Sequence, residues 1–130
     1  MIISKRQRVI EIGVKSIIGI ANIGDDDFKI KKIELSNSFK AEVELLYVPL
    51  EYIREIGENT IVPYGENENV SIMSDVALTE KVEPIKSFVY SGNESIITGI
   101  DNLVVAPFYG IVLRVKTYQD NSIISANIII

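Results

Sequence analysis

The segment from residue 39 to residue 48 restricts the fold more than any other part of the chain. Apolar and charged side chains alternate along it, and the apolar ones are Phe39, Ala41, Val43, Leu45 and Tyr47. A period of two places these side chains on one face of a β-strand, so that one face packs in a core and the other meets water. At the far end Leu46 and Val48 are apolar on the second face as well, and we expect that end to be covered.

Short segments of the same character make up most of the remaining sequence. They are rich in Ile, Val, Tyr, Phe and Thr and are separated by Gly, Asn, Asp and Pro, which is typical of strands and turns. The expected strands are residues 8–23 (one or two strands), 28–35, 39–48, 70–78, 85–90, 96–105, 109–118 and 123–130. Some eight or nine short strands at this regular spacing predict an all-β fold, an antiparallel β-sandwich that is jelly-roll-like or immunoglobulin-like.

Three stretches do not fit a plain strand. Between residues 28 and 35 the apolar phase shifts by one residue across Lys31 and Lys32, as a β-bulge would produce. Residues 50–56 allow one short helix, because apolar residues recur there at every third position, or else an irregular excursion. Residues 58–69 are polar and contain Pro and Gly, so they predict a long exposed loop.

The composition excludes several classes of function. The chain has 130 residues, no Cys and no His, and we expect a single domain over residues 1–130. Without thiols and imidazoles there are no disulfides, no thiolate or Ser–His catalysis and no usual zinc ligands. No apolar run reaches the ~20 residues of a spanning helix, and the start lacks a signal-peptide pattern. We therefore expect synthesis in the cytoplasm, no membrane partner and no cleavable signal.

Charge is divided unevenly along the chain. Residues 1–32 hold seven Lys/Arg and four acidic residues, a balance of +3, whereas residues 33–130 hold six and fourteen, a balance of −8, which together give the net charge of −5. An acidic body disfavours direct nucleic-acid binding, because phosphate contacts need clustered Lys and Arg. Residues 1–8 contain Lys5, Arg6 and Arg8. They predict either a basic N-terminal arm that docks on an acidic neighbour or solvated charges on an edge strand.

Two groups of carboxylates are candidates for chemistry, and each has a plainer explanation. Asp25, Asp26 and Asp27 offer oxygen ligands to calcium, but the spaced pattern of calcium loops is missing and a solvated turn is favoured. Glu42 and Glu44 share one strand face, as a glycosidase pair would, but ordinary solubilising surface is favoured. We therefore predict no catalytic residue, no metal site, no cofactor and no enzymatic activity.

The remaining candidate residues are suited to contacts with other proteins. Besides the three basic residues near the start, they are loop aromatics and apolar strand ends: Tyr64, Phe108, Tyr109, Leu46, Val48, Ile128, Ile129 and Ile130. Aromatic side chains in loops often anchor interfaces or stack on sugars. An aliphatic terminus is costly in water, so the last strand is expected to be paired inside a sheet or buried against another subunit. In an assembly, another chain should cover at least one of the two apolar ends.

From about residue 30 to the end, the order of these patterns resembles a family of small bacteriophage virion structural proteins, found as tail, neck or head-fibre components. The resemblance rests on Leu46-Tyr47-Val48-Pro49 at the end of one strand and on Asn102-Leu103-Val104-Val105 later in the chain, with apolar strands at residues 85–90, 96–100, 110–115 and 123–130. Pro107-Phe108-Tyr109-Gly110 stands where the family has Gly-Asp. The position within a particle therefore stays open.

The resemblance implies a non-enzymatic structural or assembly protein of a phage particle, a capsid-decorating, head-fibre or neck–tail accessory subunit. It implies a homo-oligomer located in the virion, with other virion structural proteins as partners. A glycan- or receptor-binding module that uses the loops around Tyr64 and Phe108 is the alternative. A carboxylate-based hydrolase ranks last, because it would need a cleft with two carboxylates at a catalytic separation.

Overall fold

The computed structural model describes residues 2–9, 13–37, 40–55, 59–64, 68–73, 76–90, 96–97, 102–117 and 122–130. These residues form fourteen β-strands and one 3-10 turn, η1 (Leu50–Tyr52). The strands are β1 (Ile2–Val9), β2 (Gly13–Asn22), β3 (Phe28–Ile30), β4 (Lys32–Asn37), β5 (Ala41–Pro49), β6 (Ile53–Glu55), β7 (Asn59–Tyr64), β8 (Glu68–Met73), β9 (Val76–Leu78), β10 (Lys86–Tyr90), β11 (Ile96–Ile97), β12 (Leu103–Val105), β13 (Tyr109–Thr117) and β14 (Ser122–Ile129). The described part of the chain contains no helix that is long and apolar enough to cross a membrane.

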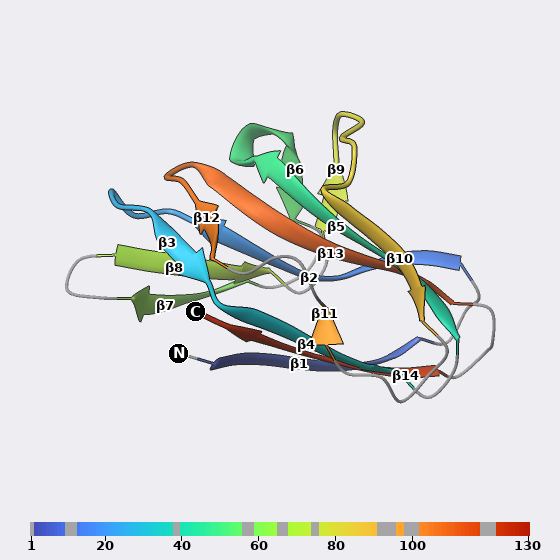
Figure 1. Ribbon diagram of the computed structural model, residues 1–130. Helices are drawn as coiled ribbons and strands as arrows, with labels where there is room; N and C mark the ends of the chain where they lie inside the picture. Colours follow the sequence, from blue (N-terminus) through green and yellow to red (C-terminus); the bar gives the residue numbers. More distant parts are fainter. Residues whose placement is uncertain are drawn as a thin grey trace.

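Two antiparallel sheets face each other and form a sandwich (Figure 1). Sheet A has the strand order β1-β14-β4-β11, and sheet B has the order β10-β5-β13-β2-β8-β7. Two short ribbons, β12-β3 and β6-β9, complete the described strands. The all-β sandwich predicted from the sequence is therefore confirmed.

The strand order selects the jelly roll from the two predicted kinds of sandwich. With the β7–β8 hairpin and the two short ribbons set aside, the pairs are nested: β1 with β14, β2 with β13, β4 with β11, and β5 with β10. Successive members of this set alternate between sheets A and B until β5, and again from β11 onward. This folded-over hairpin, with the first strand beside the last, is the double Greek key of a jelly roll.

The main hydrophobic core lies between sheets A and B. Ala41, Val43 and Leu45 are fully buried there, as the alternation in this segment predicts, and Tyr47 at the end of the same face is half-buried. Other strands contribute every second residue to the same cluster: Ile18, Ile20, Ile33, Leu35, Ile111, Leu113, Ile124 and Ile128. Phe39 lies outside the described residues.

A second hydrophobic cluster covers the outer face of sheet B. Leu46, Val48 and Val112 are completely buried in it, and Val76 joins them from β9. The cover consists of η1, β6 and β9, which lie above β5 and β13 in Figure 1 and are here called the covering ribbon. Leu46 and Val48 were expected to be covered, and the chain's own ribbon covers them. The prediction that Leu46 and Val48 form an interface is corrected, because they have no surface to offer a partner.

Three local expectations are wrong or only partly met. Residues 58–69 were expected to be an exposed loop, but β7 lies there and pairs antiparallel with β8, most of which falls in the expected strand 70–78. Pro63 is tolerated because β7 is the edge of sheet B. The short helix expected at residues 50–56 is one 3-10 turn followed by β6. The phase shift near Lys31 is no bulge, because the chain leaves the β3–β12 ribbon there and enters sheet A as β4.

The two ends of the chain lie side by side in sheet A (Figure 1). β1 pairs with β14 from Ile2 to Val9, so the basic segment is an edge strand and not a free arm. β14 is in turn paired with β4, which places the last strand inside the sheet. Ile128 and Ile130 are buried in the core, so the prediction that they form an interface is corrected, whereas Ile129 faces outward and is half-buried. The chain therefore covers Leu46, Val48, Ile128 and Ile130 by itself, contrary to the expectation that in an assembly another chain covers one of the two apolar ends.

Candidate interaction surface

The turn between β12 and β13 presents an aromatic side chain to solvent. Pro107 occupies the second position of this turn, Phe108 has a positive φ of 65° at the third, and the Tyr109 N–H donates to the Ala106 carbonyl at 3.1 Å. These are the features of a type II turn, which favours glycine at its third position. Phe108 is instead a bulky residue, and it is 69% exposed.

The backbone of Phe108 is held on both sides. Its N–H donates to the Asn22 carbonyl at 2.9 Å, and its carbonyl accepts from the Leu50 N–H at 2.9 Å. A left-handed conformation costs a non-glycine residue about 1–2 kcal/mol, so these contacts are needed to maintain it. The chain therefore fixes an apolar ring in water, at a position where glycine would be less strained.

Two stacked tyrosines pack at the turn. The rings of Tyr47 and Tyr109 are stacked, with centroids 5.0 Å apart and planes 7° apart. The Tyr47 hydroxyl also accepts from the Ala106 N–H at 3.2 Å. Next along the chain, Gly110 is so close to β2 that a Cβ would lie 2.8 Å from the Ile20 carbonyl oxygen. Tyr47, Phe108 and Tyr109 are here called the aromatic patch. Hydrogen bonds, ring stacking and close packing hold the backbone that presents it.

A buried asparagine joins the elements under the patch. Asn22 is 0% exposed; its amide nitrogen donates to the carbonyls of Asp26 at 2.8 Å and Val105 at 2.9 Å. Its side-chain oxygen accepts from the Gly24 N–H at 3.0 Å, which is an Asx-turn. Sequence reasoning missed this residue, although an Asn two residues before Gly is the signal that such a turn gives.

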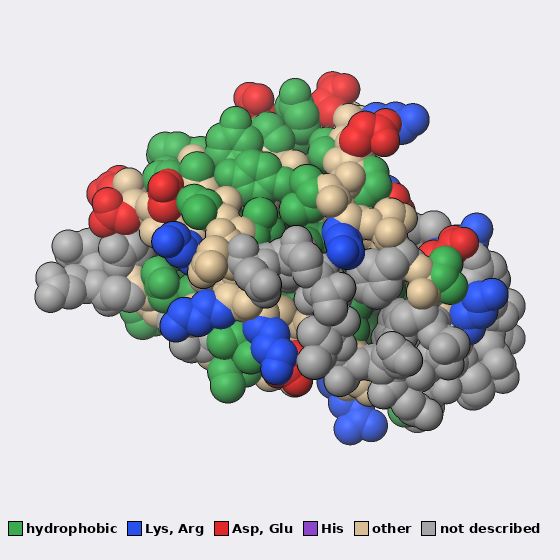
Figure 2. All heavy atoms as spheres, in the orientation of Figure 1, with side chains coloured by type: hydrophobic (Ala, Val, Ile, Leu, Met, Phe, Trp, Pro, Cys, Tyr) green, Lys and Arg blue, Asp and Glu red, His purple; other side chains and the backbone are tan. Residues whose placement is uncertain are grey.

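Apolar side chains also gather on the surface over neighbouring elements. Figure 2 shows hydrophobic side chains gathered over the region where Figure 1 draws β12, β13 and the covering ribbon, with acidic side chains at the upper and left margins. Near the turn, Ile23 is 37% and Val104 is 41% exposed. Asp25, Asp26 and Asp27 form the exposed bend after β2, as the sequence predicted for a turn. Exposed apolar side chains surrounded by charged ones are typical of an interaction surface.

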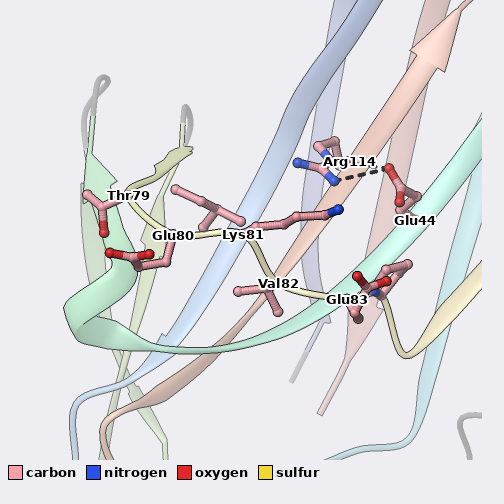
Figure 3. Close-up of a pocket in the computed structure, with 9 residues that line it drawn as sticks. Glu44, Thr79, Glu80, Lys81, Val82, Glu83 and Arg114 are labelled. Carbon is pink, nitrogen blue, oxygen red and sulfur yellow. Dashed lines mark hydrogen bonds and ion pairs between the residues drawn. The ribbon is translucent and has the colours of Figure 1, made fainter.

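A hollow of about 400 Å³ lies where residues 79–84 cross the outer face of sheet B (Figure 3). The Arg114 guanidinium donates to Glu44 Oε1 at 3.2 and 3.3 Å, and Lys81 extends toward this ion pair in Figure 3. Glu44 thus serves an ion pair between β5 and β13, and Glu42 does not line the hollow. Among the described residues, no three acidic side chains are grouped to hold a metal ion.

The predicted interface residues are therefore in very different environments. Phe108 and Tyr109 are exposed and adjacent. Tyr64 belongs to the edge strand β7 and is half-buried, with its ring edge-on to Phe28 at a centroid distance of 5.7 Å, so it does not join the aromatic patch. Lys5 and Arg6 are on the sheet A edge, the first half-buried and the second exposed, and the side chain of Arg8 lies outside the described residues.

The comparisons with known proteins add no argument about function. No protein-family model matches the chain, and no curated protein matches it. Among solved structures, the chain is similar to an aminopeptidase from the marine sediment archaeon Thaumarchaeota archaeon, with 12% sequence identity and a TM-score of 0.20. The alignment covers 98% of this chain and spans 23% of the aminopeptidase, and a likeness that low carries no argument.

Proposed function

We propose that this chain is a non-enzymatic assembly subunit of a bacteriophage particle, with a capsid-decorating, head-fibre or neck–tail accessory role. The jelly roll supports the proposal, because viral capsid domains are among the proteins that use this fold. A fold hosts many functions, so the site has to carry the argument.

The observation that carries it is the strained, exposed Phe108. A sequence free to vary for stability would place glycine at the third position of this turn. An exposed phenylalanine, held by two backbone hydrogen bonds and flanked by the stacked tyrosines, is what an interface anchor requires. Aromatic anchors of this kind supply most of the binding energy of many interfaces.

The test compares Phe108→Gly with Val89→Ser. Val89 is 54% exposed on β10, so its replacement removes apolar surface elsewhere on the molecule. Light scattering after size-exclusion chromatography measures the oligomeric state, and mass spectrometry of purified particles measures incorporation. We expect an oligomer or particle-bound protein for the native chain and for Val89→Ser, and loss of either state for Phe108→Gly. A strict monomer that is absent from every particle fraction would contradict the proposal.

Glycan or receptor binding is the second candidate, and the stacked tyrosines are the observation that favours it. Tyr109 is 38% exposed beside Phe108, so the patch offers flat aromatic surface next to the carboxylates of the bend after β2. On a glycan array, Tyr109→Ala and Phe108→Gly should both lose any hit that the native chain gives. An array without a hit removes this candidate and leaves the assembly proposal unaffected.

A further inference from the structure

The two sheets of the sandwich differ in width. Sheet A ends at β1, which contacts β2 of sheet B, and sheet B continues past β2 with β8 and β7. Over the inner face of the β7–β8 hairpin, sheet A therefore supplies no strand among the described residues. Within the described part of the chain, sheet A therefore has a place for one more strand beside β1.

The inner face of this hairpin is apolar and only partly covered. Ile72 is opposite Ile20 and Val62 is opposite Val70, and Ile20 and Val70 are both in the main core, so all four side chains point to the same side. Val62 and Ile72 pack against the core but remain half-buried. A strand placed over them would remove apolar area from water at about 25 cal/mol per Å².

The edge that such a strand would extend is basic. β1 pairs with β14 on one side, and no described strand pairs with its other side. It carries Lys5 on the core side and Arg6 on the solvent side, as expected from the buried Ile3. Within the described residues neither cation has an ion-pair partner, whereas Lys32 pairs with Glu34 and Arg114 pairs with Glu44.

We infer that β1 and the β7–β8 hairpin form a docking site for an extended, acidic segment of another polypeptide. The segment pairs its backbone with the free edge of β1 and becomes the fifth strand of sheet A. Its apolar side chains cover Val62 and Ile72, and its carboxylates face Lys5 and Arg6. This is β-strand addition, in which the backbone supplies affinity and alternate side chains supply specificity.

Charge selects an acidic partner over a second copy of β1. Two β1 strands in a two-fold pair would bring Lys5, Arg6 and Arg8 of both copies together, and like charges across strands are destabilising. An acidic strand gains on both faces instead, because each opposite-charge pair across strands is favourable. This surface is separate from the aromatic patch and does not depend on the proposed function.

The test uses the full chain and two synthetic octapeptides. The acidic one has Val at positions 1 and 3 and Glu at all others, so that one face carries both Val and Glu and the other face carries Glu alone. The basic one has Lys in place of each Glu. Amide chemical shifts of the labelled chain locate binding, and titration gives the Kd. We expect the acidic peptide to shift amides of β1 and of the β7–β8 hairpin and the basic peptide to leave them unchanged. Reversing both charges, as Lys5→Glu with Arg6→Glu, should weaken binding about tenfold. The matched control is Lys86→Glu on β10, the opposite edge of sheet B, which should change the Kd less than about twofold.

Salt provides a readout that needs no variant. Raising the ionic strength from about 0.01 M to about 0.5 M shortens the Debye length severalfold, so binding of the acidic peptide to the native chain should weaken. Several results would overturn the inference: no shift with the acidic peptide, equal binding of the basic peptide, or shifts confined to β10. Concentration-dependent shifts of β1 without any peptide would assign the edge to a second copy and overturn it as well.

Discussion

Phe108 and Asn22 are linked by one hydrogen bond and have opposite effects on stability. The Asn22 carbonyl accepts from the Phe108 N–H, so the buried asparagine holds the backbone of the strained turn. The asparagine satisfies two carbonyls and one N–H with its side chain, which stabilises the fold. Phe108 has a positive φ and an exposed ring, and both features destabilise the fold. A residue that is unfavourable for folding and yet firmly held is the strongest single argument for a binding role.

Replacing Phe108 by glycine should stabilise the chain by about 1 kcal/mol, because the relief of left-handed strain exceeds the entropy cost of glycine. Chemical denaturation measures the free energy of unfolding. Asn102→Gly is the matched control, since Asn102 also has a positive φ, of 59°, but asparagine tolerates that region and the gain should be a few tenths of a kcal/mol. A destabilised Phe108→Gly variant would mean that the ring contributes to folding, and the argument for binding would fall.

Asn22→Ala should lower the free energy of unfolding by about 2–3 kcal/mol, because buried backbone groups lose their partners. Asn127→Ala serves as the control. Asn127 accepts a hydrogen bond from Ser4 Oγ at 2.7 Å in an exposed position, so its loss should cost about 0.5 kcal/mol or less. Equal losses for the two variants would show that Asn22 does not organise the end of the sandwich.

The single elements were predictable where a pattern is local. Ala41, Val43 and Leu45 are buried on one face because a period of two fixes the face of a strand. The same pattern does not identify which segment covers a strand. Leu46 and Val48 were therefore predicted as interface residues, but the covering ribbon of the same chain buries them. Strand β7 was missed because Pro63 interrupts it, which an edge strand tolerates, whereas most of β8 lies in the expected strand 70–78. Exposed Phe108 was predicted as a site residue, but its strain depends on backbone geometry that composition does not encode.

The contact of the covering ribbon with sheet B can be tested at Gly19. A Cβ there would lie 2.8 Å from Val76 Cγ2 and 2.9 Å from Met73 Cε, so Gly19→Ala should destabilise the chain by about 1–3 kcal/mol. Val76→Ala removes the clashing atom, and the double variant should be less destabilised than the sum of the two single variants. Additive losses in denaturant titrations would place the ribbon away from Gly19. For Gly110→Ala the obstacle is the Ile20 backbone oxygen, and no such side-chain rescue exists.

The nested pairing of strands joins the most distant parts of the sequence. β1 pairs with β14, and β2 pairs with β13, so neither sheet can form from one half of the chain. This is why the strand order was not predictable from the sequence: alternation assigns faces to strands, but pairing partners more than a hundred residues apart leave no local signal. The choice between jelly roll and immunoglobulin-like sandwich therefore required the structure.

The same topology sets the expected speed of folding. Closing long loops costs entropy before any distant strand pair is formed, so folding rates fall as contacts become less local. We expect stopped-flow refolding with relaxation times in the range of about milliseconds to seconds, as for other β-sandwiches. Because β14 lies between β1 and β4, deleting residues 122–130 should abolish cooperative unfolding altogether. Microsecond refolding, or a cooperative transition in the shortened chain, would mean that a local part of the sequence folds without the nested pairs.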